Sequence, residues 1–352
     1  MWHGIYGHDE VVEQFRRALS RQRLASSFLF VGPPGVGKKT FALKFAQTLL
    51  CQSRPEQAMD PCEECPGCVQ VKAGAHPDLQ VVSKPPDKSL LPLELLIGDK
   101  EHRMREGLCH DIALRPFMGG RKVAIIDDAD YLAAEGANCL LKTLEEPPPN
   151  SCLILIGTSP AKQLPTIRSR CQLIRFRPLA DETIADLLVA QGIIDTAEHA
   201  EQLTRYSEGS LTRAMELADA DLWEFRQQLF ARLGEPVLES VRLSKTVAGF
   251  VEKAGKEAAP RRERLRQIAI FAADFYRQLL RVLAGDDSRV EEDLRTLLLA
   301  AAAHWLGREE AAAACLDRCL EAVEQVDRNA YQPTLIEAWL DRLAALSTPP
   351  RA

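Results

Sequence analysis

The sequence predicts an α/β domain with a doubly wound parallel sheet, followed by domains built from helices alone. Three observations support this prediction. A glycine-rich loop at 32–38 joins an apolar run to a helical pattern, further apolar runs alternate with helical patterns as far as Phe176, and no run typical of a strand follows Pro178. Strands and helices that alternate around such a loop are typical of a parallel sheet, whose ligands bind at the carboxyl ends of the strands.

The loop has the pattern of a phosphate-binding site with one departure. It lies between a strand predicted at Phe28–Val31 and a helix predicted at Lys38–Leu50. Its glycines carry no β-carbon, so successive backbone N–H groups can point into one concave site at the start of a helix. The usual pattern ends in lysine followed by Ser or Thr, whose hydroxyl binds Mg²⁺. Here Lys39 holds the hydroxyl position and Thr40 comes one residue too late. We therefore expect a second cation close to where the metal would sit. The predicted nucleotide-binding residues of this segment are Gly32, Pro33, Pro34, Gly35, Val36, Gly37, Lys38, Lys39 and Thr40.

The composition is that of an ordinary globular protein. A chain of 352 residues is expected to form two or three domains. The net charge of −6 gives no whole-chain argument for nucleic-acid affinity, although a local basic patch would be compatible with it. No apolar run has the length of a membrane span, and the first residues lack a signal-peptide pattern, so we expect a cytoplasmic protein with no membrane contact.

Four of the ten cysteines have the spacing of a metal site. Cys62, Cys65 and Cys68 are spaced around a Pro-Gly turn, and Cys51 precedes them. This pattern predicts a closed, structural Zn²⁺ site of four thiolates, with incidental reduced cysteines as the alternative. The other cysteines are predicted to be small buried apolar residues: Cys109, Cys139, Cys152, Cys171, Cys315 and Cys319.

The next strand ends in acidic residues. A strand at Asp78–Val82, an unassigned segment at 85–97 and a helix at Asp99–Ile112 are predicted first. A strand that begins at Lys122 then ends at Asp127 and Asp128. Asp127 is the candidate carboxylate for Mg²⁺, and Asp128 is a weak candidate base that stands where a longer Glu is common in active ATPases. An ordinary solvated strand end is the alternative.

The sheet is completed by two further strands. A helix at Ala133–Glu146 is stopped by three prolines, and a strand at Cys152–Gly157 ends in Thr158 and Ser159. Hydroxyl groups at this place can sense a γ-phosphate or belong to an ordinary loop start, and both interpretations stay open. A strand at Gln172–Phe176 follows.

The C-terminal half is predicted to be helical. Short helices are expected at 181–191, 196–207 and 210–218, and nearly continuous helix from 222 to 346. A bundle used for assembly is the natural interpretation. The predicted domains are 1–178 with a four-cysteine zinc module at 51–68, a small helical domain at 179–220, and an all-α domain at 221–352.

Several motifs together resemble a known family, the AAA+ clamp-loader subunits of bacterial DNA polymerase III, most closely those of the delta-prime type. The resemblance covers nearly all of residues 1–220. It rests on Gly-Pro-Pro-Gly-Val-Gly-Lys at 32–38, the four-cysteine knuckle, His-Pro-Asp at 76–78, Ile-Ile-Asp-Asp-Ala-Asp at 125–130, Asn-x-Leu-Leu-Lys-Thr-Leu-Glu-Glu-Pro-Pro at 138–148 and Ser-Arg-Cys at 169–171.

The resemblance implies an AAA+ fold with a helical lid at 179–220 and a C-terminal collar. It also implies that Arg170 is an arginine finger that reaches the ATP of a neighbouring subunit. The implied partners are tau/gamma and delta subunits in a hetero-pentameric ring, with the sliding clamp and primed DNA reached through that complex in DNA replication.

Three departures from the tau/gamma motor subunits imply weak or absent ATPase activity. Lys39 replaces the threonine, Asp128 replaces a glutamate, and Arg213 falls one position after the nucleotide-sensing arginine of those subunits. Occupancy of the loop by ATP or ADP, and of the metal position by Mg²⁺, stays open.

Two alternatives stay open at this point. The first is an active tau/gamma-type ATPase motor. The second, of another class, is a zinc-containing nucleic-acid-binding protein, although Glu63 and Glu64 make the knuckle acidic. Lys142 and Thr143 are weak candidates for contact with DNA.

Overall fold

The computed structural model describes residues 1–118, 120–286, 290 and 292–348. The last four residues of the predicted 221–352 domain thus lie outside the described residues. By its internal contacts the chain divides into two compact units, Met1–Ala218 and Asp219–Ala352, and each is described by itself.

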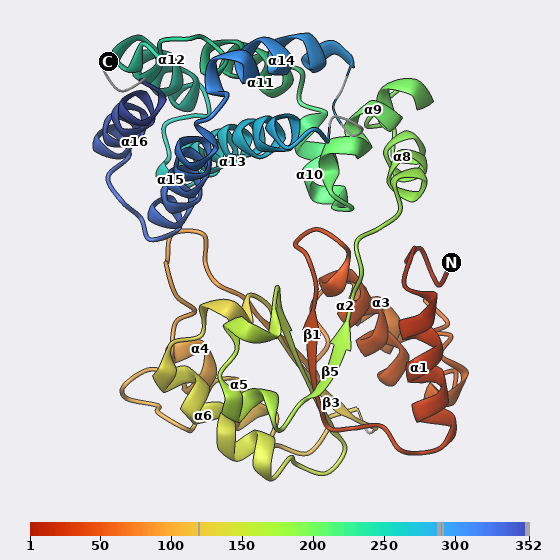
Figure 1. The fold of residues 1–352 in the computed structure, drawn as a ribbon. Coiled ribbons are helices and arrows are strands. Elements are labelled where there is room, and N and C mark those ends of the chain that lie inside the picture. Colours follow the sequence, from red (N-terminus) through yellow and green to blue (C-terminus); the bar gives the residue numbers. More distant parts are fainter. Residues whose placement is uncertain (119, 287–289, 291, 349–352) are drawn as a thin grey trace. The chain divides into compact units, whose positions relative to one another are not determined.

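The first unit is built on a five-stranded parallel sheet with the strand order β2-β3-β4-β1-β5 (Figure 1). All four strand pairs are parallel. The predicted doubly wound α/β fold is therefore confirmed. The strands are β1 (Ser27–Val31), β2 (Leu79–Val82), β3 (Lys122–Ile126), β4 (Ser151–Gly157) and β5 (Gln172–Arg175).

Helices cover both faces of this sheet because successive residues of the central strands point to opposite sides. Phe28 and Phe30 of β1 pack with α1 and α2 in one apolar cluster, whereas Leu29 and Val31 belong to a second cluster on the other face. Figure 1 shows α1, α2 and α3 on one side of the sheet and α4, α5 and α6 on the other. These helices are α1 (Asp9–Ser20), α2 (Lys38–Leu49), α3 (Pro66–Lys72), α4 (Glu94–Ile97), α5 (Leu108–Asp111) and α6 (Ala134–Glu145).

The predicted helix at Asp99–Ile112 is wrong. Only α5 is helical there, and residues 99–107 form bends and turns. Gly107 interrupts the segment and Gly98 directly precedes it, with φ angles of +89° and +81°, which residues with a β-carbon rarely adopt. A β-carbon on Gly107 would lie 2.6 Å from the Gly98 nitrogen, and one on Gly98 would lie 2.8 Å from the His102 carbonyl oxygen, so this segment is a tight loop rather than a helix.

A short helical module completes the first unit. The helix α7 (Pro165–Arg168) precedes β5, and α8 (Asp181–Ala190), α9 (Ala197–Ser207) and α10 (Leu211–Leu217) follow it. Side-chain oxygens of Thr196 and Ser210 accept a backbone N–H at the starts of α9 and α10. Such capping satisfies N–H groups that have no partner within the helix.

The second unit consists of helices over its described residues. A buried ion pair lies in its core, where Arg226 Nη2 is 3.3 Å from Asp274 Oδ2 and the two side chains are 1% and 3% exposed. Nowhere in the described parts of the chain is a helix both long and apolar enough to cross a membrane. The helices are α11 (Ala220–Leu233), α12 (Ser240–Glu252), α13 (Ala258–Leu283), α14 (Glu292–Trp305), α15 (Glu309–Asp327) and α16 (Gln332–Ser347).

Candidate nucleotide and metal sites

The phosphate-binding loop connects β1 to α2 and is closed on itself. Gly35 and Gly37 have φ angles of +72° and +93°, as the tight turn into the helix requires. The Lys38 ammonium donates to the carbonyl oxygens of Gly32 and Pro33 at 2.7 and 2.6 Å. Burial lowers the pKa of Lys38, while the charges of Asp127 and Asp130 oppose this shift. The lysine expected to meet phosphate is thus bonded to its own loop.

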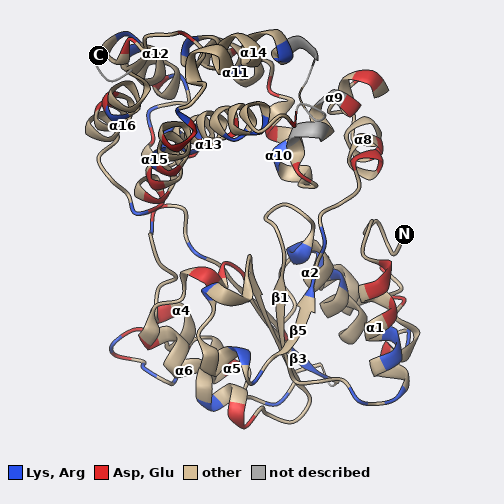
Figure 2. Cartoon of the chain, in the orientation of Figure 1, with Lys and Arg blue, Asp and Glu red and all other residues tan. Residues whose placement is uncertain are grey.

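The second lysine lies beside the candidate metal carboxylate. Lys39 Nζ lies 3.0 Å from Asp127 Oδ2, the candidate metal carboxylate at the end of β3. Figure 2 shows the basic segment at the start of α2. The predicted second cation is therefore found beside Asp127, and its ammonium balances the charge that a divalent ion would otherwise balance. Thr40 is exposed and offers no replacement ligand there.

The candidate base Asp128 is held in an uncommon conformation. Its φ angle is +57°, and its backbone N–H donates to Asp127 Oδ1 at 3.1 Å. Burial raises the pKa of Asp128, and the neighbouring Asp127 charge adds to this effect. The charge of Lys84 and a hydrogen bond from its backbone oppose both effects. The carboxyl group is thus engaged by its own chain.

Thr158 is engaged in the same way. Its backbone N–H and its hydroxyl donate to Asp130 Oδ2 at 2.8 and 2.5 Å. Gln163 Nε2 donates to the other oxygen of Asp130 at 2.7 Å. Asp130 thereby ties β4 to the segment after β3. Of the two open interpretations, this contact favours a structural part for the Thr158 hydroxyl.

The start of α10 packs directly on the loop. Leu211 N–H donates to the Gly35 carbonyl at 3.1 Å. A β-carbon on Gly35 would lie 2.2 Å from Ser210 Oγ and 2.8 Å from Thr212 Oγ1, so only glycine fits there. Arg213 turns away, and its Nη1 donates to Glu208 Oε2 at 2.9 Å. Thr212 rather than Arg213 therefore faces the loop.

The loop is supported on its other sides by His8 and Phe176. His8 Nε2 lies 2.7 Å from the Val36 carbonyl, and the ring packs edge-on against Phe176 at 4.8 Å between centroids. A β-carbon on Gly32 would lie 2.3 Å from the Phe176 carbonyl oxygen. Burial lowers the pKa of His8. The neutral imidazole therefore donates its Nε2 proton to Val36.

Arg170 lies beyond this site, after α7. Its Nη2 donates to Glu145 Oε1 at 2.6 Å, and its Nη1 donates to Thr166 O at 3.0 Å and Ser169 Oγ at 3.2 Å. The Arg170 side chain is 33% exposed. Its guanidinium is thus fixed on the surface and does not reach the loop of its own chain through any described contact.

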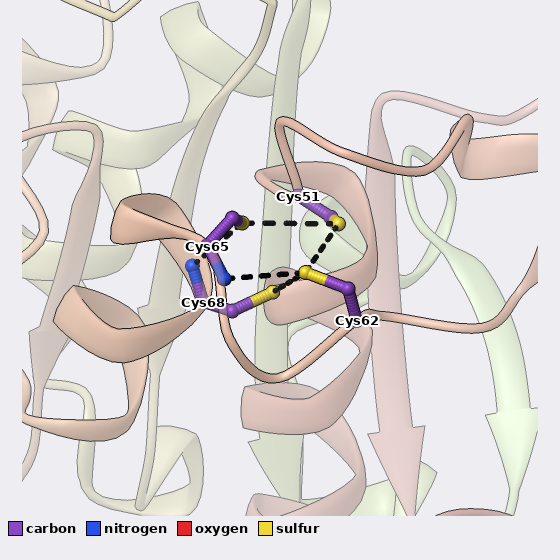
Figure 3. Close-up of side chains that lie close together, drawn as sticks. All are labelled: Cys51, Cys62, Cys65 and Cys68. Carbon is purple, nitrogen blue, oxygen red and sulfur yellow. Dashed lines mark hydrogen bonds between the residues drawn. The ribbon is translucent and has the colours of Figure 1, made fainter.

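The four predicted cysteines come together between α2 and α3. Their sulfur atoms point toward one another (Figure 3) and all lie within 4.8 Å of one another. The Sγ atoms are separated by 3.6 Å for Cys51 and Cys62, 3.8 Å for Cys62 and Cys68, and 4.0 Å for Cys51 and Cys65. Four sulfurs bound at about 2.3 Å around a tetrahedral zinc ion are about 3.8 Å apart. The donor set and its spacing therefore fit Zn²⁺.

Backbone N–H groups favour deprotonation of two thiols of this cluster. Donors from Cys65 and Glu64 lower the pKa of Cys62. Burial raises the pKa of Cys65, but N–H donors from Cys68 and Gln52 act against it and bring it to about 6. Burial raises the pKa of Cys68. Metal binding requires thiolates, and Cys65 is also the N-cap of α3. The cluster thus joins a metal-ligand set to the start of a helix.

The remaining predicted residues are spread more widely. Pro34 and Lys142 are exposed and Thr143 is partly buried. Cys109, Cys152, Cys315 and Cys319 are buried, whereas Cys139 and Cys171 are partly buried.

Participants that were not predicted from the sequence include Asp130, Glu145 and Thr212. Asp130 and Glu145 each stand in a motif that carries the resemblance, but their partners are 28 and 25 residues away. Only the spatial arrangement shows these pairs. The sequence does contain a signal for Thr212. Arg213 falls one position after the nucleotide-sensing arginine of the tau/gamma subunits, and a shift of one residue turns a helical side chain by about 100°, so Thr212 takes the place of that arginine.

Comparison with known proteins shows which proteins this chain resembles. Residues 7–180 match the family described as "DNA polymerase III, delta subunit". The chain is 33% identical over 211 residues to the DNA polymerase III subunit delta' of Bacillus subtilis and 35% identical over 210 residues to that of Pseudomonas aeruginosa. These alignments cover 60% and 59% of this chain, and 59% and 60% of the relatives, so the chain matches about three fifths of their length.

The motor-type relatives are similar over the same region. The DNA polymerase III subunit tau of Bacillus subtilis is 30% identical over 218 residues, which are 62% of this chain and 35% of that protein. The predicted resemblance to DNA polymerase III delta-prime subunits, which are related to the tau/gamma clamp-loader subunits, is thereby confirmed over about three fifths of the chain.

Proposed function

We propose that this chain is a delta-prime-type subunit of a DNA polymerase III clamp loader that does not turn over ATP itself and supplies Arg170 to the ATP site of a neighbouring subunit. The observation that carries the first half of the proposal is the 3.0 Å ion pair between Lys39 and Asp127. A site whose metal carboxylate is already neutralised by a lysine has little affinity left for Mg²⁺, which phosphoryl transfer needs.

The surrounding contacts support the same proposal. Lys38 is bonded to loop carbonyls, the Asp128 backbone N–H donates to the Asp127 carboxylate, and Thr158 holds Asp130. To bind and hydrolyse a nucleotide, the site would have to exchange each of these contacts. An active tau/gamma-type motor gains no support from this arrangement.

Arg170 has the properties of a residue that acts outside its own chain. It is partly exposed, and its guanidinium cannot lose its charge in a protein. A planar cation of this kind stabilises the charge that spreads over a transferred phosphoryl group. The partners in this proposal are tau/gamma and delta subunits in a five-membered ring, with the sliding clamp and primed DNA as the ring's substrates.

In this proposal the two all-helical parts have structural tasks. Residues 179–220 would be a lid that stays on the loop, since Leu211 is bonded to Gly35. Residues 221–352 would be the collar that holds the ring together. The four cysteines would hold a structural Zn²⁺ ion that fixes the segment between α2 and α3 and takes no part in the reaction.

The test compares turnover in three preparations. The isolated chain should show no magnesium-dependent ATP turnover, its addition to the motor subunits should raise theirs, and Arg170→Ala should abolish the increase while the complex still assembles. Arg168→Ala is the matched control, because Arg168 is an exposed arginine two positions away. Magnesium-dependent hydrolysis by the isolated chain would instead establish the motor function. Zinc-dependent binding of DNA by the isolated chain would favour the nucleic-acid-binding alternative.

A further inference from the structure

The guanidinium of Arg170 is held by three acceptors on two elements. Two of them, Thr166 O and Ser169 Oγ, belong to α7 and its end, within four residues of the arginine. The third is Glu145 Oε1, the last residue of α6, at 2.6 Å. The two local acceptors cannot fix the position of the arginine relative to the sheet, because they move with it. Glu145 can, since it comes from another helix.

Glu145 itself has a fixed position. It ends α6, whose Leu140 and Leu144 are buried in the apolar cluster on that face of the sheet. Three prolines follow at 147–149, so the chain turns away directly after this residue. Ile167 of α7 is buried in the same cluster. A rigid α6 end and a rigid α7 therefore carry the two halves of one ion pair.

This contact leaves part of the guanidinium available. Arginine has five N–H donors. Two acceptors share Nη1 and one uses Nη2, so the Nε proton and one Nη2 proton have no acceptor among these contacts. Each of these protons can donate to a phosphate oxygen. The arginine can thus stay bonded to Glu145 while it donates to a phosphate of another subunit.

We propose that Glu145 is a positioning residue that aims Arg170 at the phosphates of a neighbouring subunit's nucleotide. This inference rests on the proposed function of Arg170. A long arginine side chain has many rotamers, and selection of one of them before the subunits meet removes an entropic cost from the reaction. Because a misplacement of about 1 Å can cost a large factor in rate, loss of the contact should slow turnover rather than weaken assembly.

The experiment uses the complete clamp-loader complex reconstituted from its subunits, with MgATP, sliding clamp and primed DNA. Glu145→Ala should lower kcat by about 5- to 10-fold with KM for ATP nearly unchanged, because the interaction matters where charge develops. Glu145→Gln keeps an acceptor oxygen at the same reach and should restore most of kcat. Glu146→Ala is the matched control, since Glu146 is an exposed neighbour and should behave as wild type.

A double variant separates positioning from a merely structural effect. In an Arg170→Ala background, Glu145→Ala should have no additional effect, because a residue that acts through Arg170 has nothing left to position. Unchanged or higher kcat in Glu145→Ala would overturn the inference, as would a change confined to KM or a further loss in the double variant. If Arg170→Ala itself leaves turnover unchanged, the proposed function fails; if only Glu145→Ala does, the inference alone fails.

Discussion

Single side chains around the phosphate-binding loop are bonded within their own unit. Lys38 donates to loop carbonyls, Lys39 pairs with Asp127, and the Asp128 carboxylate accepts a hydrogen bond from the Lys84 backbone. An incoming nucleotide would have to replace these contacts with contacts of equal strength. Because a partner lost without replacement leaves a polar group unsatisfied, the present arrangement opposes entry of phosphate and metal.

Replacement of Lys39 by threonine should restore a response to magnesium. Lys39→Thr removes the ammonium from Asp127 and places a hydroxyl at the position that the motif prescribes. We expect the unfolding temperature of the variant to rise when Mg²⁺ and ATP are added together, whereas the wild type should not respond to Mg²⁺. A ligand at tenfold its Kd stabilises by about 1.4 kcal/mol.

The control for this variant is Lys44→Thr, which breaks another ion pair of the same helix, with Glu63. It should not respond to Mg²⁺ and ATP. If Lys39→Thr also fails to respond, the Lys39 ammonium is not what closes the site, and the packing of Ser210 and Thr212 on Gly35 closes it instead.

His8 should make stability depend on pH. Burial lowers the pKa of folded His8, whereas in the unfolded chain its pKa is about 6.5. As pH falls through that value the unfolded chain takes up a proton that the folded chain resists, so stability present at higher pH is lost. His8→Gln should flatten the dependence of the unfolding free energy on pH between 7.5 and 5, by at most about 1.4 kcal/mol per pH unit.

The comparison for His8 is His199→Gln, at an exposed position in α9. Chemical denaturation at a series of pH values measures both variants. An unchanged slope in His8→Gln would mean that His8 does not govern this dependence.

At the scale of elements, the four cysteines connect the end of α2 to the start of α3. Trp2 Nε1 donates to Met59 O at 2.6 Å, and His3 lies 2.7 Å from Asp60 Oδ1, so the first residues are also bonded to this segment. Residues 51–65 have little regular structure apart from one short turn of helix at Glu56–Ala58. A segment with so few backbone hydrogen bonds of its own needs a ligand set to hold it.

Removal of the metal should therefore loosen this segment. Cys65→Ser removes both a zinc ligand and the N-cap of α3. We expect loss of bound zinc, faster hydrogen exchange at 51–72 and a loss of about 3 kcal/mol or more in stability. A chelator should have the same effect on the wild type. Cys139→Ser, outside the cluster, should retain one zinc ion, and one zinc per chain in Cys65→Ser would refute the four-thiolate site.

Much of the first unit could be predicted because its signals are local. Strand ends, the glycine turn and the cysteine spacing each occupy a short stretch, and from them the sheet, the Lys39 position and the four-cysteine cluster followed. The predicted helix at Asp99–Ile112 failed because Gly107 within it and Gly98 directly before it have positive φ angles. The pairs of Glu145 with Arg170 and of Leu211 with Gly35 could not be predicted, since they join residues 25 and more apart and depend on how whole elements pack.

At the scale of the whole molecule, the two compact units have separate cores. The core of the second contains Asp274, which accepts from Arg226 and from Gln278 at 3.3 and 2.9 Å. A buried charge that loses its partner destabilises strongly. A substitution in the core of one unit is therefore expected to destabilise that unit and leave the other unchanged.

Asp274→Ala should lower the stability of the second unit by about 3–5 kcal/mol, because Arg226 would be left buried without this carboxylate. Hydrogen exchange measured by mass spectrometry should show faster exchange within 219–348 and no change within 1–218. Asp317→Ala, at an exposed position of α15, is the control and should exchange as wild type. Faster exchange in both units would show that they unfold as one.

The ion pair of Lys39 with Asp127 has a consequence for how the chain responds to its surroundings. A magnesium ion obeys mass action, so its occupancy follows the free concentration of metal and nucleotide. The ammonium of Lys39 is attached to the backbone and cannot be diluted or chelated. The charge at this position is thus the same when ATP is abundant and when it is scarce, and the shape of the first unit should not vary with the energy supply of the cell.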